Sequence, residues 1–207
     1  MTIRNTALLT DQYELTMVSA ALRHPVAHRQ CVFEVFARRL PDGRRYGVVA
    51  GTSRILDELA DFRFGDDEIA VVERFLDAET VEWLRGYEFT GDIDGYREGE
   101  LYFPNSPILT VRGTFAEAVV LETLILSILN HDSAIASAAA RMVSAASRRP
   151  IIEMGSRRTH EWAAVASARA AYLAGVAATS NLEAARTYGV PSAGTAADLF
   201  ALAFTEP

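Results

Sequence analysis

The chain has 207 residues, of which 50% are hydrophobic and 23% are charged, and its formal net charge is -7. This composition excludes a disordered chain and allows a buried core in one large domain or two small ones. The negative balance argues against nonspecific binding to nucleic acid or to an anionic membrane. The single cysteine, Cys31, excludes an internal disulfide and fits a cytoplasmic location. The most apolar long stretch, residues 115–129, contains two glutamates and is too short to span a bilayer.

The first part of the chain predicts helices that alternate with short strands. Apolar residues recur at helical spacing over residues 8–22, and this helix should end before His24-Pro25. Further expected elements are strands over residues 30–39 and 46–50, separated by a Pro-Asp-Gly turn, a helix over residues 53–61, and helical structure over residues 66–86, as one helix or as two pieces.

The middle of the chain changes character twice. Residues 90–114 are rich in Gly, Pro and Asn and predict a small sheet with strands near 92–96 and 108–111. Residues 115–147 contain neither Pro nor Gly and are rich in Ala and Leu. They predict one long helix, or two helices broken near His131-Asp132-Ser133, where Asp and Ser could cap a second start.

The last part alternates strand and helix. Strands are expected over residues 150–154, 175–178 and 190–193, with helices over 159–174 and 182–188 between them. These spacings suit right-handed parallel crossovers. The overall prediction is an α/β fold, with an N-terminal α+β domain over residues 1–148 and a parallel α/β portion over residues 149–207.

Ligands bind at the carboxyl ends of strands in such arrays. Three polar sets follow the three strands: Gly155, Ser156, Arg157 and Arg158; Thr179, Ser180 and Asn181; Gly194 and Thr195. Free amides at a helix start and arginine side chains suit an anion, and hydroxyl and amide groups add hydrogen bonds. Taken alone, the arginine pair of the first set is better explained as solvating a helix start, and each of the other two sets is equally explained by helix capping. Together they predict a site for a small anionic or polar ligand.

Several segments, in this order, resemble nicotinate phosphoribosyltransferase. They are LLTDQYELTM (8–17), FEVFARRLPDGRRYGVVAG (33–51), NSPILTVRGTFAEAVVLETLILSILN (105–130), EMGSRRTHE (153–161), ATSN (178–181) and GVPSAGTAA (189–197). The resemblance implies an N-terminal α+β domain followed by the first βα units of a type II phosphoribosyltransferase barrel, which is incomplete here.

The resemblance also implies an activity. The family joins nicotinate to phosphoribosyl pyrophosphate, giving nicotinate mononucleotide and pyrophosphate in NAD biosynthesis, and ATP hydrolysis drives the reaction through a phosphohistidine. ATP and magnesium are co-substrates, with no cofactor held tightly. Members of the family are cytoplasmic homodimers, in which the opening helix of one subunit reaches the active site of its partner. No nucleic acid or membrane partner is expected.

Site residues follow from the same resemblance. Tyr13 would stack on the nicotinate ring, although its spacing alone also fits a core position in an amphipathic helix. Thr195, beside Gly194, would contact nicotinate. Arg157 and Arg158 would hold anionic groups of the substrates. The substrate loops would also include Ser180 and Asn181.

Two departures from the family pattern begin at the same place. Asp198 stands where the family carries the phosphorylated histidine, so no catalytic residue is assigned, and Asp198 is expected to cap a last helix over residues 199–204. The family also extends well beyond residue 207. Both departures suggest a truncated homologue, or a reading frame that shifts near codon 198.

The chain is therefore expected to be inactive alone. Two alternatives remain open. One is a sister transferase that acts on nicotinamide or quinolinate. The other is a non-catalytic metabolite-binding or regulatory fragment that pairs with a full-length partner.

Overall fold

A computed structural model describes residues 5–204 of the chain, except for the side chain of Ala201. The chain divides into two compact units, Met1–Ser133 and Ala134–Pro207. The dividing point lies inside the long helix α6 (Glu122–Ala146), whereas the sequence analysis placed it after that helix, at residue 148.

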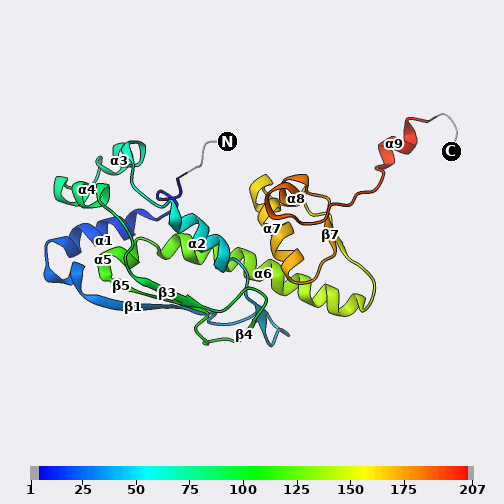
Figure 1. The fold of residues 1–207 in the computed structure, drawn as a ribbon, viewed down its shortest axis with the longest axis horizontal. Helices are drawn as coiled ribbons and strands as arrows, with labels where there is room; N and C mark the ends of the chain where they lie inside the picture. The colour runs from blue at the N-terminus through cyan, green and yellow to red at the C-terminus, as the bar shows by residue number, and fades with distance from the viewer. Residues whose placement is uncertain (1–4, 205–207) are drawn as a thin grey trace. The chain divides into compact units, whose positions relative to one another are not determined.

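The first unit contains a three-stranded antiparallel sheet in the order β1–β5–β3 (Figure 1). Its strands are β1 (Gln30–Val35), β3 (Asp92–Gly95) and β5 (Leu109–Thr114). Successive side chains point to opposite faces. Phe33 therefore faces the core opposite Val111, while the neighbouring Val32 lies on the open face and is 61% exposed.

Short helices pack against this sheet and against one another. They are α1 (Gln12–Leu22), the 3-10 turn η1 (Pro25–His28), α2 (Thr52–Ala60), α3 (Asp66–Val72), α4 (Ala78–Arg85) and α5 (Phe115–Val119). A separate two-stranded ribbon pairs β2 (Gly47–Val48) with β4 (Leu101–Tyr102). The helix and strand predictions for residues 8–114 are confirmed, with ends that differ by a few residues.

Of the two alternatives for residues 115–147, a break near His131-Asp132-Ser133 is wrong, and the helix runs unbroken from Glu122 to Ala146 after an earlier break. The break lies between α5 and α6, at Val120 and Leu121, and residues 131–133 are inside α6. Asp132 is fully buried and accepts two hydrogen bonds from Arg54 of α2, at 2.8 and 3.0 Å. The Ser133 hydroxyl accepts from the Ala50 N–H and donates to the Ala50 carbonyl, both at 3.1 Å. The polar pair that resembled a cap thus makes tertiary contacts.

Glu14 of α1 is a second buried acidic residue of the first unit. Its Oε1 accepts hydrogen bonds from the backbone N–H and the hydroxyl of Thr123, at 2.9 and 2.7 Å, and its Oε2 accepts from the Asp11 N–H at 3.2 Å. Thr123 lies in the first turn of α6, where free amides favour a carboxylate. Burial nevertheless raises the pKa of Glu14.

The second unit alternates strand and helix, as predicted, except that the third expected strand, residues 190–193, forms only a single bridge. β6 (Ile152–Glu153) pairs in parallel with β7 (Ala178–Thr179), and a parallel bridge joins Thr179 to Ser192. The helices are α7 (Glu161–Leu173), α8 (Leu182–Tyr188) and α9 (Asp198–Leu202). Small side chains let α7 pack closely, since Ala168 and Ala171 are almost fully buried.

Asp198 is the first residue of α9, one position inside the helix that it was expected to cap. Within residues 5–204, no helix combines the length and the apolar character needed to cross a membrane.

Replacing Asp132 with asparagine should lower the free energy of unfolding by about 3 kcal/mol, because the change leaves the partly buried Arg54 guanidinium without an anionic partner. The matched control is Asp66→Asn, which breaks the exposed pair with Arg85 and should cost less than about 1 kcal/mol. Urea unfolding of both variants measures the difference. Equal losses would contradict the assignment of Arg54–Asp132 as the stronger contact.

The raised pKa of Glu14 predicts a pH-dependent stability. The folded state holds the Glu14 proton more tightly than the unfolded state, so stability should fall as pH rises from about 4.5 through the raised folded value. Glu14→Gln removes this titration. The stability of the parent chain minus that of the variant should therefore decrease between the two pKa values. Urea midpoints at several pH values measure this, with the exposed Glu82→Gln as matched control. A difference that rises or stays constant with pH would exclude the interpretation.

Candidate functional site

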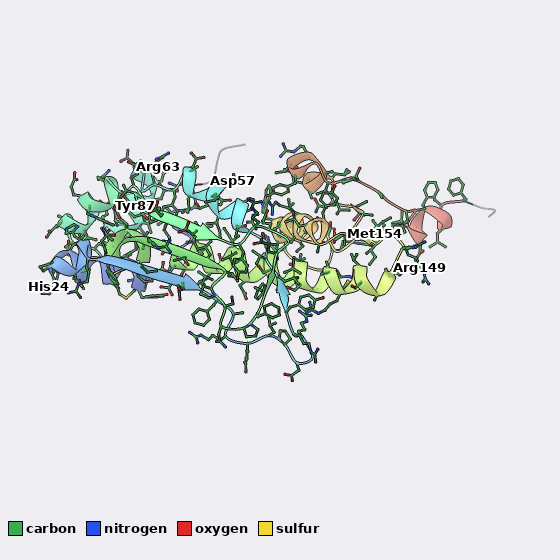
Figure 2. All side chains as sticks on the ribbon, turned by 60° about the horizontal axis from the view of Figure 1, so that its bottom comes forward. His24, Asp57, Arg63, Tyr87, Arg149 and Met154 are labelled. Carbon is green, nitrogen blue, oxygen red and sulfur yellow. The ribbon has the colours of Figure 1, made fainter. Side chains whose placement is uncertain are left out.

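The carboxyl ends of β6 and β7 open into a hollow of about 540 Å³ in the second unit. Its lining comes from all three predicted polar sets: Met154, Ser156, Arg157, Ser180, Gly194, Thr195, Ala196, Ala197, Asp198 and Leu199. Met154, at the end of β6, is labelled in Figure 2. Parallel strands present their carboxyl ends at the same edge of the sheet, which explains why residues as far apart in the chain as Met154 and Leu199 meet here.

The predicted residues divide into three groups. Arg157, Ser180, Gly194 and Thr195 line the hollow, and Asp198 joins them. Asn181 begins α8, where its Oδ1 accepts the Ala184 N–H at 2.9 Å. Arg158 is exposed and does not line the hollow; its backbone N–H closes a turn onto the Gly155 carbonyl at 2.8 Å.

Thr179 does not present its hydroxyl to a ligand, contrary to the expectation for the second polar set. Its side chain is fully buried, and its hydroxyl donates to Glu153 Oε2 at 2.6 Å. Sequence reasoning missed Glu153, because it stands inside the short apolar run of β6. A strand of two residues is too short for the alternation of polar and apolar side chains to show which face of the sheet Glu153 occupies.

A closed ring of hydrogen bonds joins the first two loops. The Gly155 N–H donates to Glu153 Oε1, and the Thr179 hydroxyl donates to Glu153 Oε2. Thr179 Oγ1 accepts the Asn181 N–H at 3.0 Å, and Asn181 Nδ2 donates to Ser156 Oγ at 3.1 Å. The chain from Ser156 back to Gly155 completes the ring. These five residues, called the loop ring below, hold the two loops in one arrangement.

Tyr13 belongs to the first unit. It lies in the first turn of α1, and its side chain is 48% exposed, so it is not the core residue that helical spacing alone allowed. Partial burial raises the pKa of Tyr13, and the carboxylates of Glu122 and Glu14 raise it further. The phenol therefore remains neutral at physiological pH, and its ring offers a flat apolar surface to a ligand.

Comparisons with known proteins agree with this architecture. Residues 8–130 match the family model described as the nicotinate phosphoribosyltransferase (NAPRTase) N-terminal domain. The chain is 69% identical over 195 residues to nicotinate phosphoribosyltransferase pncB1 of Mycobacterium tuberculosis (strain ATCC 25618 / H37Rv), covering 94% of this chain and 44% of that protein. It is 36% identical over 203 residues to nicotinate phosphoribosyltransferase of Bacillus subtilis (strain 168), covering 97% of this chain and 41% of that protein.

Solved structures show the same relation. The crystal structure of human nicotinic acid phosphoribosyltransferase superposes with a TM-score of 0.86 at 32% identity, over 95% of this chain and 41% of that one. Nicotinate-nucleotide pyrophosphorylase from Pyrococcus furiosus shares the fold, with a TM-score of 0.79 at 23% identity, over all of this chain and 47% of that one. The chain thus spans less than half the length of each of these relatives. It belongs to the nicotinate phosphoribosyltransferase family and contains that family's N-terminal domain.

Proposed function

We propose that this chain carries nicotinate-binding loops of a nicotinate phosphoribosyltransferase. The reaction joins nicotinate to phosphoribosyl pyrophosphate and releases nicotinate mononucleotide and pyrophosphate, in the cytoplasmic synthesis of NAD. The observation that supports this most directly is the convergence of Arg157, Ser180 and Thr195 on one hollow at the carboxyl ends of parallel strands.

The chemistry of the hollow suits the proposed substrates. Nicotinate is a flat aromatic acid, and phosphoribosyl pyrophosphate carries several phosphate oxygens. Arg157 offers a guanidinium that can grip a carboxylate or phosphate through two parallel hydrogen bonds. Ser180 and Thr195 add neutral hydroxyl donors, and Gly194 leaves its backbone open to close approach.

The remaining roles rest on the family resemblance. Tyr13 would stack on the nicotinate ring in a partner's site of a homodimer, and its exposed ring is compatible with that role. ATP and magnesium are proposed as co-substrates, which would make the complete reaction ATP-dependent. Asp198 stands in place of the phosphorylated histidine, and this supports the proposal that the 207-residue chain binds substrate without turning it over.

The experiment that tests the proposal measures nicotinate binding by calorimetry and nicotinate mononucleotide formation in a coupled assay, on the purified 207-residue chain. We expect saturable binding and no turnover with phosphoribosyl pyrophosphate and ATP. Turnover would contradict the proposal that the chain with aspartate at position 198 does not catalyse the reaction. Absence of nicotinate binding by folded protein would contradict the proposed substrate.

Arg157→Ala should weaken nicotinate binding at least about tenfold, because a charge-assisted hydrogen bond contributes roughly 1.5–3 kcal/mol. The control is Arg186→Ala on α8, an arginine that pairs with Glu183 and does not line the hollow. Calorimetric titration of both variants decides the point. An equal loss of affinity in the two variants would remove Arg157 from the site.

A further inference from the structure

The loop ring fixes which atoms in it are donors. The Glu153 carboxylate can only accept, so the Thr179 hydroxyl must donate to it and uses a lone pair to accept the Asn181 N–H. The orientation of the Asn181 amide follows from the start of α8. Its Oδ1 accepts the Ala184 N–H at 2.9 Å, so the atom that faces Ser156 is the Nδ2 donor.

This orientation determines the role of Ser156. Because Asn181 Nδ2 donates to Ser156 Oγ, the serine oxygen is an acceptor in the ring, and its own proton has to point elsewhere. Across residues 5–204, Asn181 is the only group that forms a hydrogen bond with the Ser156 hydroxyl. Ser156 is half-buried and lines the hollow, which leaves the proton available to a ligand there.

The charges around the hollow increase the contribution of the Ser156 hydroxyl to anion binding. Arg157 contributes one positive charge to the lining and Asp198 one negative charge, so their formal sum is zero. Affinity for an anion therefore depends strongly on neutral donors with a fixed direction. Ser156 differs from Ser180 and Thr195 in this respect, since the Asn181 amide already occupies one of its two lone pairs and prevents its proton from pointing toward residue 181.

We propose that Ser156 is a further binding residue, whose hydroxyl donates to an anionic oxygen of the ligand, and that Asn181 is the positioning residue that makes Ser156 a donor. The anionic oxygen belongs to a carboxylate or a phosphate. The inference rests on the proposed function for the place where the ligand lies. It adds Ser156 as a binding residue and assigns its hydroxyl as a hydrogen-bond donor, which the family resemblance did not supply.

The test compares ligand affinities of the 207-residue chain and its variants by calorimetry, with nicotinate, pyrophosphate and neutral nicotinamide as probes. Ser156→Ala should weaken binding of at least one of the two anions by about tenfold, whereas Ser156→Thr, which keeps the hydroxyl, should stay within about twofold. Nicotinamide binding should be unaffected by Ser156→Ala. The matched control is Ser144→Ala, which lies on an exposed position of α6 outside the hollow.

A double-variant cycle tests the role of Asn181. Asn181→Asp keeps a good helix cap but replaces the amide donor with an acceptor, so the Ser156 proton should turn toward residue 181. In that background, Ser156→Ala should cause no further loss of anion affinity. A merely structural role for Ser156 predicts the same loss in both backgrounds.

The outcomes separate this inference from the proposed function. Pyrophosphate binding that depends on Ser156, without nicotinate binding, would support the inference and contradict the proposed substrate. Nicotinate binding that is unchanged in Ser156→Ala would leave the proposed function intact and overturn the inference, provided pyrophosphate binding is also unchanged. If neither anion binds to folded protein, both are wrong.

Discussion

The buried carboxylate of Glu14 is the contact on which the arrangement of the first unit depends. It joins α1 to the first turn of α6 through hydrogen bonds to Thr123, and it also satisfies the Asp11 amide at the start of α1. A buried charge is tolerated only when such partners are in place. Because Tyr13 precedes Glu14 directly, the same contact determines where the exposed tyrosine ring stands.

The second unit also depends on side-chain hydrogen bonds, but there they order loops instead of joining two helices. Its strands are only two residues long, so few backbone hydrogen bonds hold the loops that follow them. The loop ring adds side-chain hydrogen bonds at the point where the ladder ends. Glu153 and Thr179 therefore give order to loops that a longer sheet would otherwise have to organise, and they do so beside the hollow.

Much of this architecture could be predicted from the sequence. Helical spacing located α1, α7 and α8, and the strand–helix alternation identified the edge where polar loops meet. Family resemblance supplied Tyr13, which no pattern distinguishes from a core residue. The sequence could not exclude a helix break near residue 131, because Asp132 and Ser133 have the composition of a cap but contact tertiary partners at Arg54 and Ala50.

Glu153 was missed and Thr179 was expected to face a ligand, and both errors have the same physical cause. Glu153 and Thr179 act through partners about 25 residues away, and their distance of 2.6 Å depends on the register between β6 and β7. No local pattern encodes that register. Arg158, next to Arg157, was equally attractive by residue type, but the turn that closes on Gly155 leaves it outside the hollow.

Gly155 shows how such a ring constrains sequence change. A Cβ added at this position would lie 2.6 Å from Glu153 Oε1, so the carboxylate would have to move away and its hydrogen bonds in the loop ring would be disturbed. The restriction does not come from a left-handed backbone, since Gly155 is not among the residues with positive φ. Tolerance at positions 153 and 155 is therefore linked. A shorter side chain at 153 makes room for alanine at 155, and divergent homologues should exchange the two residues together rather than singly.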